Sequence, residues 1–166
     1  MEIQNYLSNI EKILEKHFDI EKNVELSGFN CDLFAKYRVI NQRTFLTKKD
    51  VIDRYENNEF IFIKQANNWD LVEVEHFTKE LIRISNLLIK PNRYHMSTAI
   101  TGVILTEKSN QAIQQFVEKF KYNKSYMFYL HGWSEIRLLL VDLVNMRVYT
   151  NKAGKGVKKV FETPNK

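Results

Sequence analysis

Two glycines bracket a lysine near the end of the chain, in the run TNKAGKGVKK at residues 150–159, a composition that a phosphate-binding loop could use. A Walker-type loop needs two glycines five residues apart, followed by Lys and then Ser or Thr, between a strand and a helix. Here Gly154 and Gly156 are two residues apart, and Val157 stands where the metal-holding hydroxyl is needed. A dinucleotide-binding loop needs a third glycine and a following βαβ unit, which this segment lacks. The run therefore predicts a solvent-exposed turn and tail, in which one of the two glycines relieves a positive φ.

Positive charge gathers at the same end of the chain. Residues 1–120 contain 16 Lys and Arg against 17 Asp and Glu, whereas residues 121–166 contain 9 against 3. A face of one sign favours an acidic partner, so we expect weak binding of nucleic acid, of another polyanion or of an acidic protein. The candidate polyanion-binding residues are Arg147, Lys152, Lys155, Lys158 and Lys159. The alternative is that this basic end only increases solubility, because runs of charge are usually solvated surface.

The histidines and the cysteine lack the spacing of a metal site or of an activated nucleophile. The four histidines, at positions 17, 76, 95 and 131, form no His-x-His or His-Glu-x-x-His motif, and no Cys-x-x-Cys is present. Glu73 and His76 share one helical face, but a di-iron bundle needs a second such pair and two more glutamates. We therefore assign this pair to a helix surface and predict neither a metal nor a cofactor. Cys31 precedes Asp32, which does not lower a thiol pKa, so we expect a small buried side chain.

A nuclease of the restriction-endonuclease type is a further alternative, because the order of a helix, strands, a helix and a strand is compatible with that core. Such a site needs an Asp on one strand, then a carboxylate and a lysine two residues apart on the next. Asp32 could be the first residue, but the nearest following pair, Glu59 and Lys64, is five residues apart. An odd separation directs two strand side chains to opposite faces. This pair therefore fits one metal site poorly.

Two short runs could instead line a small-molecule cleft. RYHMST, at residues 93–98, leads into a predicted strand, and HGWSE, at residues 131–135, surrounds a glycine at a predicted tight turn. If both runs lie at the same end of the sheet, His95, His131 and Trp133 could line one pocket of an enzyme. The alternative is that Trp133 covers the edge of the core and that both histidines are exposed.

The elements that would position these residues begin with three amphipathic segments. Apolar residues recur at three- and four-residue steps, which predicts helices near 3–17, 70–89 and 110–121. Asp70 and Glu73 have the spacing of a capping box that opens the second helix. Ser109 is the predicted cap of the third helix.

Strand patterns occupy most of the remaining chain. Alternation predicts strands at 33–39 and 59–65 with a charged loop at 47–58 between them, and a β-branched run predicts a strand at 97–107. Three more strands, at 125–131, 136–144 and 147–151, are joined by short turns and predict a C-terminal β-meander. We therefore expect an α+β fold in which about three helices pack on one face of a mainly antiparallel sheet.

Length and composition predict a single domain over residues 1–166, with a helix in 1–18 docked on the core and a basic tail at 152–166. With one cysteine, no intrachain disulfide can form, and the N-terminal segment lacks the pattern of a signal peptide. No apolar run approaches the ~20 residues that a membrane-spanning helix needs. We therefore predict a cytoplasmic protein without a membrane partner. The oligomeric state is left open by the sequence.

Several short motifs resemble those of an uncharacterised family of small bacterial domains. They are FAKY at 34–37, YENNEFIFIK at 55–64, HMST at 95–98, TGVI at 101–104, HGW at 131–133 and NKAGK at 151–155. The resemblance covers the chain from about Leu33 onward. It implies a domain of unknown function with no assigned activity, so it provides no catalytic residues.

The function class that these observations favour is a binding or regulatory module that works through its basic C-terminal surface. An enzyme that uses the cleft around His95 is the alternative class. Salt separates the two, because binding of a polyanion through lysines weakens steeply as salt rises, whereas binding in a small-molecule cleft responds mildly.

Overall fold

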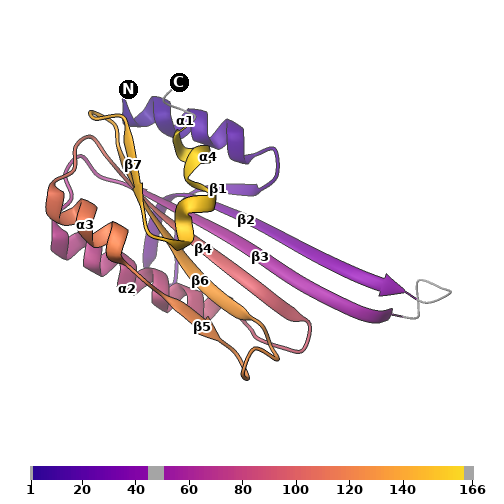
Figure 1. Ribbon diagram of the computed structural model, residues 1–166. Helices are drawn as coiled ribbons and strands as arrows, with labels where there is room; N and C mark the ends of the chain where they lie inside the picture. Colours follow the sequence, from indigo (N-terminus) through magenta and orange to yellow (C-terminus); the bar gives the residue numbers. More distant parts are fainter. Residues whose placement is uncertain (1, 45–50, 163–166) are drawn as a thin grey trace.

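One mixed sheet of seven strands runs through the chain, in a computed structural model that describes residues 2–44 and 51–162 (Figure 1). The strands are β1 (Asp19–Leu26), β2 (Phe29–Thr44), β3 (Val51–Gln65), β4 (His95–Thr106), β5 (Asn123–Ser125), β6 (Trp133–Asp142) and β7 (Arg147–Thr150). The helices in this part of the chain are α1 (Ile3–Leu14), α2 (Leu71–Leu88), α3 (Gln111–Lys119) and α4 (Lys158–Glu162), with a short 3-10 helix, η1 (Ala153–Gly156), before α4.

The sheet is mixed, and the prediction of a mainly antiparallel sheet is wrong. The strand order is β1-β2-β3-β4-β6-β5, and β7 also pairs with β6. The pairs β3–β4 and β4–β6 at the centre are parallel, whereas the pairs toward the edges are antiparallel. The reason is that α2 returns the chain to the start of β4, and α3 together with β5 returns it to the start of β6, which makes parallel neighbours.

The helices cover both faces of the sheet, which corrects the prediction that they share one face. One hydrophobic cluster joins α2 and α3 to the sheet through residues such as Phe77, Ile113 and Leu138. A second cluster joins α1 and α4 to the opposite face through Tyr6, Phe161 and the neighbouring sheet residue of β6, Leu139. Figure 1 shows α1 and α4 next to each other, far from α2. The uninterrupted apolar run of β6 is buried on both faces for this reason.

The three predicted helices form, and local capping signals mark the starts of α2 and α3. The capping box of α2 is confirmed: the Asp70 carboxylate accepts from Glu73 N at 2.7 Å, and the Glu73 carboxylate accepts from Asp70 N at 2.8 Å. The cap of α3 is Asn110, whose side chain accepts from the backbone N–H of Ile113 at 3.0 Å. The predicted cap, Ser109, is wrong by one residue, because its hydroxyl donates instead to a carboxylate on β6.

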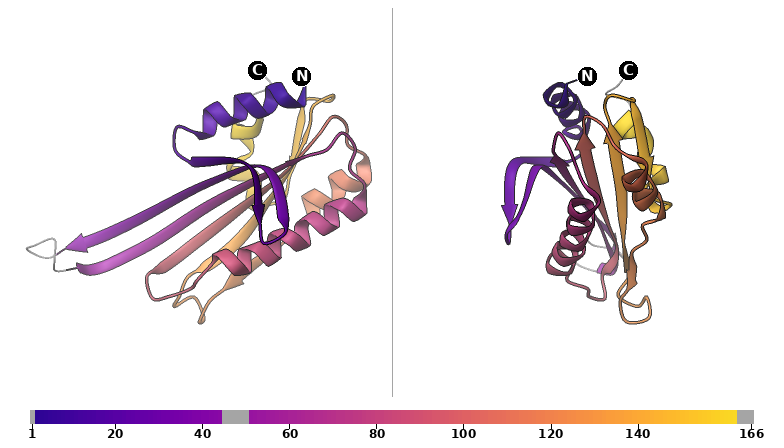
Figure 2. Two further views of the ribbon diagram at one scale, coloured as in Figure 1. Left: turned by 180° about the vertical axis from the view of Figure 1, so that it is seen from behind. Right: turned by 90° about the vertical axis from the view of Figure 1, so that its left-hand side faces the viewer.

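Strands β2 and β3 form a hairpin that extends past the neighbouring strands (Figures 1 and 2). Asn41 pairs with Tyr55, whereas β4 begins to pair with β3 only at Glu56. The charged loop predicted for 47–58 is therefore strand from Val51 onward, and the remainder of it lies outside the described residues. The sequence of this stretch is rich in charged residues and asparagine, so its composition resembles that of a loop.

The C-terminal region departs from the predicted meander and tail. The predicted strand at 125–131 ends at Ser125, and β5 and β7 lie along the same edge of β6 instead of on either side of it. Residues 153–162 form η1 and α4, with Phe161 buried in the core, so up to this point the segment is not an exposed tail. Neither glycine of the 150–159 run has a positive φ; Gly28 and Gly132 do. The helices η1 and α4 have only four and five residues, which is too short for a helical periodicity to be visible in the sequence.

Candidate functional site

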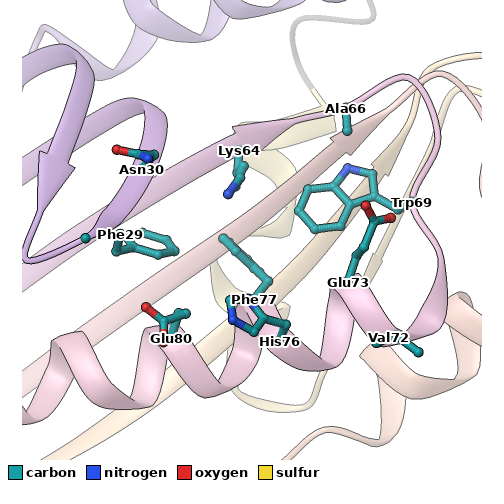
Figure 3. A pocket seen from close by; sticks show the side chains of 11 residues that line it. Phe29, Asn30, Lys64, Ala66, Trp69, Val72, Glu73, His76, Phe77 and Glu80 are labelled. Carbon is teal, nitrogen blue, oxygen red and sulfur yellow. The ribbon is translucent and has the colours of Figure 1, made fainter.

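A cleft of about 430 Å³ lies between the β1–β2 hairpin, the end of β3 and the first half of α2 (Figure 3). We call it the aromatic cleft. Its walls carry the side chains of Phe29, Asn30, Lys64, Trp69, Glu73, His76, Phe77 and Glu80. This volume is in the range of sites that hold small organic ligands, roughly 300–1,000 Å³.

Three aromatic rings form the apolar part of the cleft. The centroids of Phe29 and Phe77 are 5.8 Å apart, and those of Trp69 and Phe77 are 5.7 Å apart at 70°. The hairpin places Phe29 here because Gly28, at φ +84°, turns the chain directly before it. The buried stripe of α2 supplies Phe77, and Trp69 stands immediately before the cap of that helix. The rings thus come from three separate elements.

The two carboxylates of the cleft are already engaged within the protein. Glu73 belongs to the capping box of α2. Glu80 accepts from both Nε and Nη2 of Arg83, at 3.1 and 2.5 Å. This hydrogen bond from Arg83 holds the pKa of Glu80 below its ordinary value, against a smaller opposing effect of desolvation. Neither carboxylate is poised to act as a general acid or base.

Donor groups of the cleft, by contrast, have few partners. Figure 3 shows the Lys64 side chain pointing from β3 toward α2, and its Nζ lies 5.8 Å from the centroid of the Phe29 ring. Within the described residues Lys64 forms no ion pair, and the Asn30 and His76 side chains make no hydrogen bond. The buried Nε1–H of Trp69 has no acceptor there either. The cleft therefore combines an aromatic wall with groups that can donate to a bound molecule.

The sequence placed Glu73 and His76 on a helix surface, and both side chains are exposed while also lining the cleft. The residues that give the cleft its character, Phe29, Lys64 and Trp69, were not singled out. The only local signal was a tryptophan directly before a capping box. The remainder of the cleft is assembled from segments that are far apart in the chain.

His95 and the 131–133 turn do come together at one end of the sheet. Nδ1 of His95 lies 2.6 Å from the backbone oxygen of His131, and Nε2 lies 2.9 Å from the Thr98 hydroxyl. Trp133 begins β6 and pairs with Ser97 of β4. His95 also lines a groove of about 610 Å³ beside the end of α2, but neither His131 nor Trp133 lines it. Both imidazole nitrogens of the buried His95 are engaged, which gives the ring a positioning role.

The five candidate polyanion-binding residues are only partly gathered. Arg147, Lys155 and Lys158 line one concave surface of about 580 Å³, together with Glu118 and Glu162. Lys158 forms an ion pair with Glu162 at 3.5 Å. The other two candidates, Lys152 and Lys159, do not line this surface. Two carboxylates thus reduce the positive potential at the place where three of the cations meet.

The nuclease alternative finds little support in the geometry. The carboxylate of Asp32 accepts from the backbone N–H of Gln65 at 2.8 Å, and Glu59 lies 3.8 Å from Arg137. Over residues 2–44 and 51–162, no three His, Cys, Asp or Glu side chains are grouped so that they could hold a metal ion. Asp32 and Glu59 therefore each have a structural partner, whereas Lys64 lines the aromatic cleft.

The sequence as a whole matches one protein family, described as a domain of unknown function (DUF8052), over residues 2–163. The chain belongs to this family. The resemblance to an uncharacterised family is thereby confirmed, and the match begins well before Leu33; a bacterial origin stays a prediction. No curated protein and no solved structure matched the chain. None of the helices in the described part of the chain is long and apolar enough to cross a membrane.

Proposed function

We propose that the protein is a ligand-binding module and that the aromatic cleft is its binding site. The observation that carries this proposal is the combination of three aromatic rings with the Lys64 ammonium group above one of them. The ligand class that suits it is a small planar aromatic or heterocyclic molecule that bears an anionic group. The rings would stack on the planar part, and Lys64, Asn30 or His76 would donate to the anion.

The state of the ionisable groups supports binding without turnover. The carboxylates of Glu73 and Glu80 are held by a helix cap and by Arg83. The thiol of Cys31 is buried, and desolvation followed by the charge of Asp32 raises its pKa to about 12, which keeps it protonated and unreactive. At the other end of the sheet, the engaged nitrogens of His95 argue against the alternative of an enzyme there.

Fluorescence titration with a matched pair of probes tests the proposal. Naphthalene-2-sulfonate is a planar anion, and naphthalene-2-methanol has the same ring system without the charge. We expect the sulfonate to bind more tightly, and Trp69→Leu to weaken both probes by about tenfold. Lys64→Gln should remove the preference for the anion and leave the neutral probe unchanged.

Trp133→Leu is the control, because it removes the other tryptophan of the chain at the opposite end of the sheet. It should leave the affinity for both probes unchanged. The proposal is contradicted if the Trp69→Leu and Trp133→Leu variants bind the probes with equal affinity. It is also contradicted if the preference for the anionic probe persists in Lys64→Gln.

A second candidate function is weak, sequence-independent binding of a polyanion, supported by the convergence of Arg147, Lys155 and Lys158 on one concave surface. If about three phosphates are neutralised, the affinity for duplex DNA should fall with a log–log salt slope of roughly −3. The test is a titration of labelled duplex at two salt concentrations. It compares the intact protein with a variant in which Lys152, Lys155, Lys158 and Lys159 are Gln, and binding that is unchanged in the variant contradicts this function.

We also propose that the module acts in the cytoplasm. Its one cysteine is a buried thiol without a disulfide partner, which suits a reducing compartment. Fractionation of cells that express the protein tests this location, and recovery in an extracellular fraction would contradict it.

A further inference from the structure

The connection between β5 and β6 carries an unusual group of exposed apolar side chains. Met127, Phe128, Tyr129 and Leu130 follow one another in the chain, and their exposed fractions lie between 61% and 96%, highest for Phe128. We call residues 126–131 the apolar loop. Figure 2 (right) shows this connection projecting beyond the end of the sheet. Four consecutive large apolar side chains in water are unfavourable unless something covers them.

The backbone of the loop is wound in the left-handed region at three residues that have side chains. The φ angles are 48° at Met127, 51° at Phe128 and 69° at Tyr129. Left-handed backbone is unfavourable for residues other than glycine, and it persists where the surrounding structure holds it. The loop keeps this conformation and thereby directs its apolar side chains outward.

Hydrogen bonds and ring packing at the base of the apolar loop hold its conformation. Tyr126 N donates to Gly132 O at 3.0 Å, and His131 N donates back to Tyr126 O at 3.1 Å. His95 reaches the His131 carbonyl at 2.6 Å, and its ring packs edge-on against Tyr126 with centroids 5.7 Å apart. Gly132 has a φ of +77° and lies so close to β4 that a Cβ there would be 2.3 Å from Met96 O. The apolar residues therefore sit on a rigid support.

The side chains become more polar from the tip of the loop toward its base. Met127, Phe128, Tyr129 and Leu130 occupy the tip, and the amphipathic rings of Tyr126 and Trp133 flank it. Farther back come Lys124 on β5 and Lys121 before that strand. No Asp or Glu occurs from residue 121 to residue 133, and Glu135 of β6, which pairs with Asn123 of β5, forms an ion pair with Arg137. This order matches the depth profile of a lipid surface, with an apolar interior, an interfacial layer that Trp and Tyr prefer, and anionic headgroups.

We propose that the apolar loop is a membrane-contact site, which inserts its tip into the surface of a bilayer that contains anionic lipids. The tip would lie among the upper acyl chains, Trp133 at the headgroup level, and Lys121 and Lys124 near the anionic headgroups. This contact differs from the absence of a membrane partner that the sequence predicted. The sequence-based prediction rested on the lack of an apolar run long enough for a membrane-spanning helix, and residues 125–131 were expected to form a strand.

A lipid surface suits the loop better than a protein or a nucleic acid. A stable protein interface needs about 800 Å² per partner, whereas this feature is a narrow projection of four side chains. Phe128 and Tyr129 have planar rings, but Met127 and Leu130 on either side of them have none, so the loop does not form a continuous platform on which successive bases could stack. Insertion into lipid needs only apolar side chains at the tip and cations behind them, which the loop provides.

Vesicle flotation of the full chain tests the proposal. It compares neutral phosphatidylcholine vesicles with vesicles that contain about 30% phosphatidylserine, whose surface has a negative potential. We expect the protein to float with the anionic vesicles and the binding to weaken as salt rises. Phe128→Asn should weaken binding at least tenfold, since burial of a phenyl side chain is lost. Lys124→Gln should weaken binding to anionic vesicles by about fivefold and leave neutral vesicles unaffected.

Met146→Asn is a matched control for Phe128→Asn. Both positions have a φ of 51°, both side chains are exposed, at 56% for Met146, and the two lie in turns at opposite ends of β6. Asparagine tolerates left-handed backbone, so neither change disturbs the turn, and a urea unfolding curve of each variant verifies this. Met146→Asn should float like the intact protein.

Three outcomes would overturn the proposal. They are no flotation of the intact protein with anionic vesicles, equal flotation of the Phe128→Asn and Met146→Asn variants, and self-association of the intact protein that is lost in Phe128→Asn. The last outcome, seen by analytical ultracentrifugation, would assign the loop to a second copy of the chain.

Discussion

At the residue scale, the two glycines of the 150–159 run have different roles although only one residue separates them. A Cβ on Gly154 would lie 2.1 Å from Thr150 Oγ1, a hydroxyl that is already hydrogen-bonded to the Leu138 carbonyl, whereas a Cβ on Gly156 would meet nothing within 4 Å. Gly154 is therefore needed for close packing of η1 on the end of β7. The lysines of the run are positioned by this contact and not by a phosphate-binding loop.

We predict that Gly154→Ala lowers the free energy of unfolding by about 1–3 kcal/mol, since the added methyl group overpacks the site. Gly156→Ala should have no effect or raise it by up to about 1 kcal/mol, because alanine restricts the unfolded chain at a position with ordinary φ. Urea unfolding of both variants checks the difference. Similar losses in the two would show that the close approach at Gly154 does not exist.

A buried carboxylate at the end of β6, Asp142, contributes to the pH dependence of stability. Burial favours the neutral form of Asp142, but hydrogen bonds from Ser109 and Asn145 outweigh it and hold the pKa of Asp142 below its ordinary value. Its Oδ2 accepts from both N and Oγ of Ser109, at 2.9 and 2.6 Å. Because the folded pKa is below the unfolded one, this contribution is complete above about pH 4, the unfolded pKa, and is lost as pH falls toward the folded pKa.

Asp142→Asn should therefore lower the free energy of unfolding at pH 7 by about 1.5–3 kcal/mol, since the amide NH2 group cannot accept the hydrogen bonds that the carboxylate oxygen in its place accepts. The variant should also lose less stability than the intact protein between about pH 4 and pH 2. Chemical denaturation at a series of pH values checks both. Parallel curves for the two proteins would contradict the assignment.

At the scale of elements, α2 lies on the central strand β4 where that strand has a glycine. A Cβ on Gly102 would be 2.2 Å from Leu81 Cδ1 and 3.2 Å from Phe77 Cε1. The glycine lets the helix approach the sheet, and the position of the helix in turn sets the width of the aromatic cleft, which Phe77 lines.

A double-mutant cycle measures this contact. Gly102→Ala should lower the free energy of unfolding by about 1–3 kcal/mol through overpacking, and Leu81→Ala by about 2–5 kcal/mol through the cavity it leaves. In the double variant the new methyl group occupies part of that cavity. The combined loss should therefore be smaller than the sum of the two by at least about 0.5 kcal/mol, and strict additivity would rule out the contact.

The sequence predicted individual elements well because their signals are local. Asp70 and Glu73 are enough to mark the start of α2, and alternating apolar residues mark the strand at 59–65. It did not predict parallel pairing or the distribution of helices over both faces, since these depend on contacts between residues far apart in the chain. The aromatic cleft was missed for the same reason, whereas the proximity of His95 to the 131–133 turn was correctly raised as a possibility.

At the scale of the whole molecule, the first and the last helix are joined directly. The Tyr6 hydroxyl of α1 donates to the Phe161 carbonyl of α4 at 2.8 Å, and both residues are buried. Burial also raises the pKa of Tyr6, so the hydroxyl remains a donor at any ordinary pH. One hydrogen bond thus connects residues that are 155 positions apart.

Tyr6→Phe keeps the ring and removes only the donor, so we expect the free energy of unfolding to fall by about 1–3 kcal/mol, the penalty for a buried carbonyl without a partner. The control is Tyr37→Phe, at an exposed position on β2, which should change stability by less than about 0.5 kcal/mol. Guanidinium unfolding checks the pair. Equal stability of the two variants would mean that α1 and α4 do not depend on this bond.

The parallel pairing of β3 and β4 fixes the distance between the aromatic cleft and the apolar loop. The aromatic cleft is at the C-terminal end of β3, near Lys64, whereas the apolar loop is tied to the N-terminal end of β4, where His95 pairs with Glu56. The eight residue steps from position 56 to position 64 of β3 correspond to roughly 26 Å at about 3.3 Å per residue. With the loop in a bilayer, the sheet becomes a rigid spacer. If the strands stand along the membrane normal, a molecule in the cleft is then held roughly 26 Å from the end of the sheet that contacts the lipid.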